Sequence, residues 1–225
     1  MALVREGKAE LLMKGSLHSD EVLSAVIARE TGLRTGRRLS HVFLMDVPTY
    51  HKVLLITDAA INIAPTLEDK VDICQNAIDL ARTFGVERPK VAILAAVETV
   101  NSKMPATLDA AALCKMAERG QIKGGLLDGP LAFDNAISKQ AAEIKGITSE
   151  VAGDPDILLV PDLEAGNILA KQLTFLANAD SAGLVLGARV PIILTSRADS
   201  VRSRIASCGV AVIAAHARRR AHATA

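Results

Sequence analysis

The sequence is poor in aromatic residues, with no tryptophan, one tyrosine and four phenylalanines among 225 residues. Stacking surfaces for single-stranded nucleic acid depend on aromatic rings, so such a surface is disfavoured. The net charge of +1 also argues against general affinity for nucleic acid. The one basic cluster, Arg218-Arg219-Arg220, lies near the C-terminus. There it complements a helix end or belongs to a frayed tail.

Cysteine is scarce as well. Cys74, Cys114 and Cys208 are far apart, odd in number and outside any CxxC motif, so we predict small core residues of helices and no disulfide framework. No segment resembles a signal peptide, and no apolar run is long enough to span a membrane. We therefore expect a cytoplasmic protein with no membrane partner.

Motifs for metals and nucleotides are missing. His18, His41 and His51 do not form an HxxH or HxxxH pair, and no acidic pair stands at a suitable distance. The sequence has no Walker loop, no GxGxxG after a strand and no GxSxG elbow, which disfavours nucleotide loops and serine hydrolases. We predict no metal site and no tightly bound cofactor.

What is abundant is aliphatic sequence, since half of the residues are hydrophobic. Predicted strands alternate with predicted helices, which indicates an α/β fold with a mostly parallel sheet. The strands are expected at 10–13, 40–45, 53–57, 90–97, 122–127, 156–160 and 190–194. The helices are expected at 20–30, 66–84, 107–119, 133–144, 163–179 and from 201 onward, with capping residues at Thr66 and Thr107.

The two ends of the chain each offer one strand and one helix, which is too little to cover both faces of a parallel sheet. We therefore expect the segments 10–30 and 190–216 to pack against each other. A domain made from these two units is thin, so it lacks a piece or is covered by another subunit.

The most informative segment is Ser196, Arg197 and Asp199, between a predicted buried strand and a predicted helix that begins near Val201. A helix N-terminus offers unpaired N–H groups and a positive dipole end, and arginine adds a planar fork that fits phosphate. Ser196 and Asp199 are equally suited to be ordinary helix caps, and Arg197 to be a solvated residue. This segment alone favours the second interpretation, ordinary caps and a solvated arginine.

Four other polar turns follow predicted strands, at the strand ends where open α/β sheets bind ligands. Each turn alone is more typical of caps and hydrogen-bonded loops than of a site. These turns are Lys14–Ser19, Thr57–Ala60, Asp128–Pro130 and Pro161–Asn167.

Taken together and in order, these segments resemble the phosphate acetyltransferase and phosphate butyryltransferase family over nearly the whole chain. Within that family, the butyryl-type and hydratase-linked branches are the most similar to this sequence. The similar segments are 14–19, 40–45, 56–62, 127–134, 161–167, 186–191 and 195–200.

The resemblance implies the reaction acyl-CoA + phosphate ⇌ acyl phosphate + CoA, and a two-domain fold like the isocitrate and isopropylmalate dehydrogenases with the site in the interdomain cleft. The first domain would comprise residues 1–32 and 187–225, and the inserted second domain would be residues 33–186 and form a homodimer. Family members carry a segment before the point where this sequence begins, so we expect an incomplete first domain.

The resemblance also implies roles. Asp199 would take the proton of the CoA thiol, Ser196 would donate to the oxyanion or to phosphate, and Arg197 would hold phosphate. Acetyl-type members place the acid seven residues after the serine, where this chain has Ser203, so the role of Asp199 follows the butyryl-type Ser-Arg-x-Asp pattern. The expected substrate-binding residues are Lys14, Ser16, His18, Arg34, Arg37, Arg38, Asp128 and Asn167.

Two alternatives remain. A metal-dependent decarboxylating dehydrogenase shares the implied fold, but it needs clustered acids and a lysine–tyrosine pair, and Tyr50 is the sole tyrosine. A truncated remnant with little catalysis, acting as a binding subunit, is the other.

Overall fold

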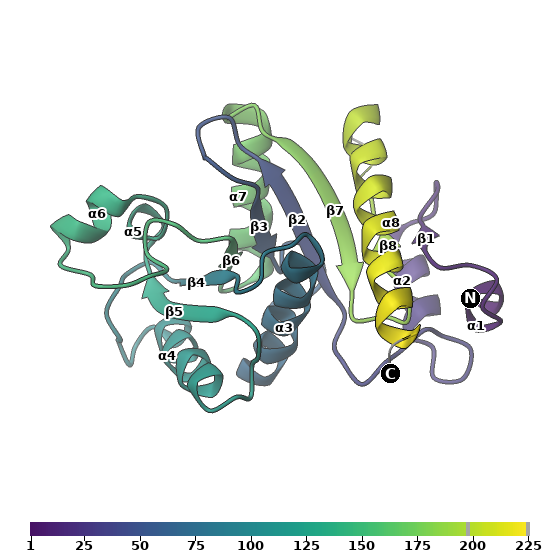
Figure 1. Cartoon of the computed structure of the whole chain (residues 1–225), viewed down its shortest axis with the longest axis horizontal. Helices are drawn as coiled ribbons and strands as arrows, with labels where there is room; N and C mark the ends of the chain where they lie inside the picture. Colours follow the sequence, from purple (N-terminus) through teal and green to yellow (C-terminus); the bar gives the residue numbers. More distant parts are fainter. Residues whose placement is uncertain (197–198, 224–225) are drawn as a thin grey trace.

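The computed structural model describes residues 1–196 and 199–223, which form one eight-stranded sheet flanked by helices (Figure 1). The strands are β1 (Leu12–Met13), β2 (Ser40–Asp46), β3 (Leu54–Thr57), β4 (Lys90–Leu94), β5 (Leu126–Leu131), β6 (Ile157–Leu159), β7 (Asp180–Leu186) and β8 (Ile192–Ile193). The helices are α1 (Ala2–Arg5), α2 (Ser19–Ile27), α3 (Leu67–Thr83), α4 (Pro105–Glu118), α5 (Phe133–Ile137), α6 (Lys139–Ile144), α7 (Leu163–Leu176) and α8 (Val201–Ala223).

The strand order is β1-β8-β7-β2-β3-β6-β4-β5. Pairs β1/β8, β3/β6, β6/β4 and β4/β5 are parallel, whereas β2 is antiparallel to both β3 and β7, and β7 is antiparallel to β8. The predicted α/β class with a mostly parallel sheet is thus confirmed. The buried side chains of β3, β4 and β6 are almost all aliphatic, as expected for parallel strands covered on both faces.

The two ends of the chain pair directly, as expected. Leu12 lies opposite Ile192 in the parallel β1/β8 ladder, and the backbone N–H of Lys14 donates to the carbonyl of Ile193 at 3.0 Å. Figure 1 shows α1, α2 and α8 on the same side of the molecule, away from β4 and β5. Val22 and Val26 of α2 are buried in this region.

Helix α3 shows how a local pattern sets its own boundaries. Thr66 accepts a hydrogen bond from the N–H of Asp69, and the Asp69 carboxylate accepts one from the N–H of Thr66, so the predicted capping box is formed. Thr107, the other predicted cap, instead lies inside α4. Its hydroxyl donates to the carbonyls of Asn101 and Met104, and Pro105 is the first residue of the helix.

The prediction missed β7 and misplaced β5. The first half of β7 is small and polar and carries Gly183, so the segment lacks the apolar alternation of a strand, yet it is paired on both sides by β2 and β8. The predicted turn at Asp128-Gly129-Pro130 lies within β5. Because β5 is an edge strand, it tolerates a proline without a backbone N–H.

The predicted helix 133–144 is divided into α5 and α6 at Ser138, whose hydroxyl accepts a hydrogen bond from the N–H of Ala141 at 3.2 Å. A Ser or Thr side chain that caps a new helix competes with continuation of the previous one.

The C-terminal helix begins where predicted, and two apolar residues in its first turns face outward. Val201 and Ile205 are 71% and 67% exposed, whereas Ser207, Ala211 and Ala214 are buried against the sheet. Small side chains let the helix approach β7 closely. In the part of the chain that the structure describes, no helix combines the length and the apolar character needed to cross a membrane.

Candidate functional site

A cavity of about 550 Å³ separates the paired chain ends from α7 and β2. Its walls come from the β1–α2 turn, β2, α7, β7 and the segment between β8 and α8. Its polar lining residues include Lys14, His18, His41, Asn167, Lys171, Thr174, Ser196, Asp199, Ser200, Ser203 and Ser207.

The cavity brings together five predicted residues from three motifs. The three motifs are far apart in the sequence and meet here because β1 pairs with β8 while β7 pairs with β2. These five are Lys14, His18, Asn167, Ser196 and Asp199.

The Ser196–Asp199 turn is locally closed. The backbone N–H of Ser196 donates to the Asp199 carboxylate at 2.7 Å, and the N–H of Asp199 donates to the carbonyl of Ser196 at 3.2 Å. Asp199 does not cap α8, because the N–H of Ser203 donates to the hydroxyl of Ser200 instead. The carboxylate of Asp199 therefore keeps acceptor positions at the cavity wall.

The opposite wall is the start of α2. His18 stands at the N-cap position, and its backbone N–H donates to Glu21 at 3.3 Å. Lys14 donates to the carbonyl of Leu17 at 3.3 Å. Both the helix N-terminus and the ammonium group favour an anion at this wall.

Asn167 lines the cavity and also makes a hydrogen bond to a neighbouring turn. Its amide donates to the carbonyl of Ala59 at 3.2 Å, which ties α7 to the turn after β3. In that turn the buried carboxylate of Asp58 accepts hydrogen bonds from the N–H groups of Ala60, Ile61 and Asn62. Asp58 is therefore a structural residue whose oxygens are already occupied.

Sequence reasoning missed three features of the wall. Lys171 and Thr174 follow Asn167 at i+4 and i+7, so one polar stripe of α7 faces the cavity. Ser200, Ser203 and Ser207, at positions i, i+3 and i+7, form a second polar stripe that faces the cavity at the start of α8. Both stripes were visible as helical spacing of polar residues, whereas the third feature, His41 on β2, lies in the family-like segment 40–45 but was assigned no role.

His41 is 1% exposed, and its Nδ1 has no hydrogen-bond partner among the described residues. Burial lowers the pKa of His41 to about 4, and the carboxylates of Asp58 and Asp199 oppose this shift only in part. The imidazole is therefore neutral near pH 7.

The remaining predicted residues lie elsewhere. Asp128 is on β5, at the opposite edge of the sheet, and Ser16 belongs to the β1–α2 turn without lining the cavity. Arg37 is paired with Asp79, and Arg38 with Asp69 at 2.9 Å. Arg34 pairs through its backbone with Ala188. Arg197 lies outside the described residues.

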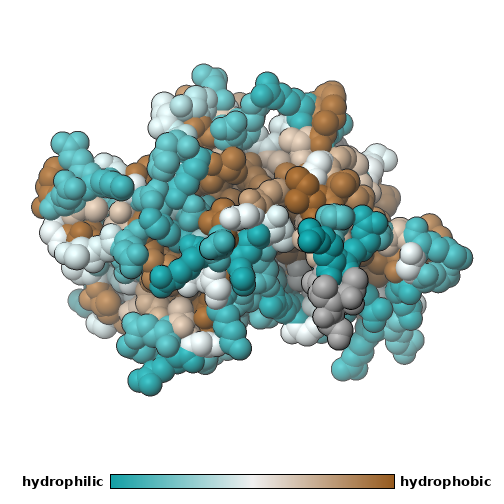
Figure 2. Space-filling view, viewed as in Figure 1, coloured by the Kyte–Doolittle hydropathy of each residue, from teal (hydrophilic) through white to brown (hydrophobic). Residues whose placement is uncertain are grey.

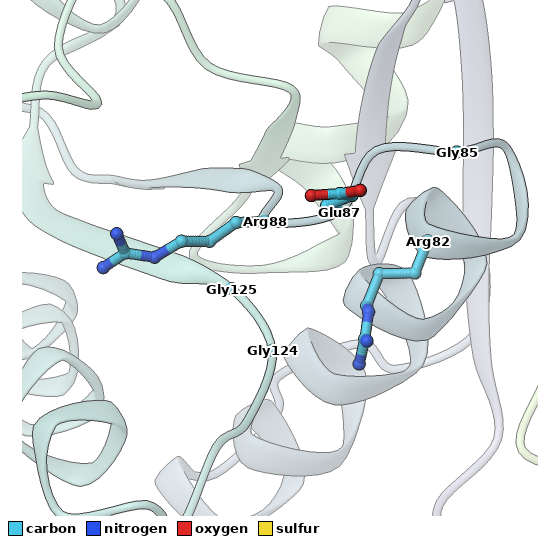
Figure 3. Close-up of a pocket in the computed structure, with 6 residues that line it drawn as sticks. All are labelled: Arg82, Gly85, Glu87, Arg88, Gly124 and Gly125. Atoms are coloured by element: carbon cyan, nitrogen blue, oxygen red, sulfur yellow. The ribbon is translucent and has the colours of Figure 1, made fainter.

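Two other hollows carry less chemistry. One is mostly apolar and lies between α3 and α8, where Figure 2 shows hydrophobic surface in the upper middle of the view. The other lies at the amino ends of β4 and β5, and Figure 3 shows the guanidinium groups of Arg82 and Arg88 extending away from each other. In the first hollow, charged lining residues are paired with one another, Lys52 with Asp156 and Arg202 with Asp180. Within residues 1–196 and 199–223, no group of three His, Cys, Asp or Glu side chains is arranged to hold a metal ion.

Comparison with known proteins gives consistent matches. A family model described as phosphate acetyl/butaryl transferase matches residues 1–215. A phosphate acetyltransferase from Rhizobium meliloti is 70% identical over 221 residues, which are 98% of this chain and 70% of that protein. A phosphate butyryltransferase from Clostridium acetobutylicum is 46% identical over 213 residues, which are 95% of this chain and 71% of that protein. The crystal structure of a branched-chain phosphotransacylase from Enterococcus faecalis superposes with a TM-score of 0.86 at 36% identity, covering 95% of this chain and 76% of that one.

Proposed function

Because this chain belongs to the phosphate acetyl/butaryl transferase family, we propose that it transfers an acyl group between CoA and inorganic phosphate. The observation that carries the proposal is the meeting of Lys14, His18, Asn167, Ser196 and Asp199 in one cavity. The transferases named among its relatives act on acetyl and butyryl groups, which defines the substrate class.

The step is direct transfer between two bound substrates. Asp199 takes the proton of the CoA thiol as the sulfur attacks the carbonyl carbon of the acyl phosphate. A carbon–sulfur bond forms, the bond from carbon to the bridging phosphate oxygen breaks, and its electron pair leaves with phosphate. The proton on Asp199 then passes to the solvent or to the released phosphate. The reverse reaction follows the same path.

The anion is held by the two facing walls. The Ser196 hydroxyl donates to the developing oxyanion or to phosphate, a contact worth about 3 kcal/mol in the transition state. Lys14, His18 and the N-terminus of α2 form the other side, where the ammonium group and the helix dipole favour an anion. Ser16, in the same turn but outside the cavity lining, is our candidate for contacting the part of a substrate that extends beyond the cavity. Arg197 holds phosphate through its fork.

The CoA moiety is larger than the cavity and extends beyond it. Arg34, Arg37 and Arg38 form a basic connector after α2 and are our candidates for its phosphates. Asn167 orients the acyl group, and Asp128 is retained as a binding candidate only from the motif resemblance. Neither a metal ion nor a covalent enzyme intermediate takes part in this mechanism.

At the level of organisation, we propose a two-domain arrangement in which residues 1–32 and 187–225 form one part and residues 33–186 the other, with the cavity between them. The direct β1/β8 pairing supports the first part. A cytoplasmic homodimer that acts without a tightly bound cofactor completes the proposal.

The test is phosphate-dependent release of CoA from acetyl-, propionyl- and butyryl-CoA by the 225-residue chain, with Ser196→Ala as the variant and Glu143→Gln as a control on exposed surface. We expect turnover in the chain and the control, and a loss of about 100-fold or more in Ser196→Ala. A folded chain without turnover on any of the three thioesters contradicts the proposal.

A further inference from the structure

Two arginines of the C-terminal basic cluster have different surroundings, and one of them faces a cavity. Arg219 is exposed and binds Glu10 at 3.2 Å. Arg218 is half-buried and lines a cavity of about 360 Å³ between α3, α8 and the turn after β7. Figure 1 shows the C-terminal end of α8 and the carboxyl end of β7 together at the bottom of the view. The basic cluster therefore contributes Arg218 to a hollow of the fold rather than to a solvated tail.

A second arginine, Arg37, lines the same cavity from the segment between α2 and β2. The position of this segment is fixed, because the Thr35 hydroxyl accepts a hydrogen bond from the N–H of Arg37 at 3.1 Å and donates to the carbonyl of Gly187 at 2.6 Å. Burial lowers the pKa of Arg218 below its ordinary value, and the guanidinium of Arg37 lowers it further. Both groups stay charged near pH 7, so two cations repel each other across this cavity.

The cavity holds more positive than negative charge. Asp79 is the one carboxylate among the described residues that line it. Each of its oxygens accepts a hydrogen bond, one from Arg37 and the other from the amide of Gln75. Within the described part of the chain, no carboxylate pairs with Arg218. One guanidinium charge is therefore unmatched, and an anion between the two arginines would relieve their repulsion.

The donors that remain define the chemistry of this anion. The Thr35 and Thr83 hydroxyls already donate to backbone carbonyls. The side-chain amide of Asn76 donates to the carbonyl of Arg38 and to the hydroxyl of Ser40. The donors left among these lining side chains are N–H groups of the two guanidiniums, whose planar forks fit the oxygens of a phosphate group. A phosphate monoester has three such oxygens and more than one negative charge, so it bridges two arginines better than a carboxylate does.

We propose that Arg37 and Arg218 together bind the phosphate group of a small phosphorylated molecule, outside the cavity that holds Ser196 and Asp199. Residues 203 to 218 of α8 span about 22 Å, so Arg218 lies far along the helix from the wall that Ser203 contributes to that other cavity. The bound anion joins α8 to the segment that leads from α2 to β2. The site shares Arg37 with the proposed CoA contacts, but binding rather than turnover tests it.

The experiment measures the binding of inorganic phosphate and of CoA by calorimetry, without an acyl donor, in the unmodified chain, Arg218→Gln, Arg37→Gln and Arg219→Gln. Arg219 is the matched control, because it is the adjacent residue and its partner is Glu10. We expect one phosphate to bind about 10-fold or more weakly in Arg218→Gln and Arg37→Gln, and within about twofold of the unmodified chain in the control. Phosphate should also raise the melting temperature of the unmodified chain and the control more than that of Arg218→Gln.

The same titrations identify the source of the phosphate group. A fall in CoA affinity in Arg218→Gln, parallel to the fall for inorganic phosphate, assigns the site to a phosphate of CoA. A fall for inorganic phosphate alone assigns it to another phosphorylated molecule. Acetate at equal ionic strength should not displace phosphate from the site, and displacement by acetate at the same concentration would overturn the assignment to phosphate.

The outcomes also separate this inference from acyl transfer. Unchanged phosphate binding in Arg218→Gln overturns the site, whether or not the chain catalyses acyl transfer. A chain without turnover that loses phosphate affinity in Arg218→Gln but not in Arg219→Gln retains the site and overturns the proposed function alone. Should Arg218→Gln fail to fold, unchanged phosphate binding in Arg37→Gln overturns the site equally.

Discussion

Two clusters of charged side chains, one at the amino ends of β3, β4 and β6 and one in the cavity, differ in how their charges are matched. In the first, Lys52 binds Asp156 at 2.7 Å, and Lys90 binds Asp154 at 2.7 Å. His51 also contacts Asp154, at 2.9 Å. Every acid there has a nearby cation, so the cluster has little capacity left for a charged ligand.

In the cavity the opposite holds. Between residues that the structure describes, no ion pair joins Lys14, Lys171 or Asp199; Lys14 donates to a backbone carbonyl and Asp199 accepts a backbone N–H. His41 adds an unpartnered ring nitrogen. The difference teaches that similar residues serve structure when they satisfy each other and are free to meet a substrate when they do not.

The largest expected effect comes from removing the acid of the cavity. Asp199→Asn removes the proton acceptor for the thiol but keeps its shape, so we expect kcat to fall about 100- to 10,000-fold with little change in melting temperature. Steady-state assay and calorimetry check this. If Asp199→Asn lowers the melting temperature strongly and leaves kcat unchanged, Asp199 serves stability, and the proposed difference between the two clusters is wrong.

The converse change is Asp154→Asn. Burial raises the pKa of Asp154, but hydrogen bonds from Lys90 and Lys52 outweigh it and hold this pKa well below its ordinary value. Losing these charge-assisted bonds should lower stability by about 2 kcal/mol and the melting temperature by about 4–8 °C. Activity at 25 °C should stay within about twofold, and a catalytic defect without a stability loss would contradict the structural role.

A smaller effect distinguishes the buried imidazole. The folded-state pKa of His41, about 4, lies below its ordinary value of 6.5, so its neutral form stabilises the fold fully above pH 6.5. This contribution is lost as the pH falls from 6.5 toward 4. The melting temperature of the unmodified protein should therefore fall more steeply in this window than that of His41→Gln. Parallel curves would show that the ring is not held neutral by burial.

The smallest effect concerns the cation of α7. Lys171→Ala should raise KM for phosphate or CoA about 2- to 5-fold and leave kcat nearly unchanged, because the residue is exposed and its field is screened. Lys115→Ala, which removes an exposed cation paired with Glu118, is the control. Adding salt should raise KM for phosphate or CoA in the unmodified protein and have less effect in Lys171→Ala. This difference would show that Lys171 acts through its charge.

Local patterns predicted the elements whose signals lie within a few residues. The capping box at Thr66 and the aliphatic runs of β3, β4 and β6 needed no tertiary information. Strand β7 escaped because its pairing on both sides, rather than its own composition, makes it a strand. Helix α8 begins near Val201, as predicted, but Val201 and Ile205 face outward, so packing against the sheet decided which face of the helix is buried.

By itself, the sequence determined the α/β class, most element boundaries and the residue types at strand ends, because these depend on periodicity and on hydrogen bonds between near neighbours. Tertiary structure alone decided which of those residues meet. The β1/β8 and β2/β7 ladders bring Lys14, His18, Asn167 and Asp199 to one cavity and leave Asp128 at the far edge. It also placed His41 beside Gly183, a contact between strands more than 140 positions apart that no local pattern encodes.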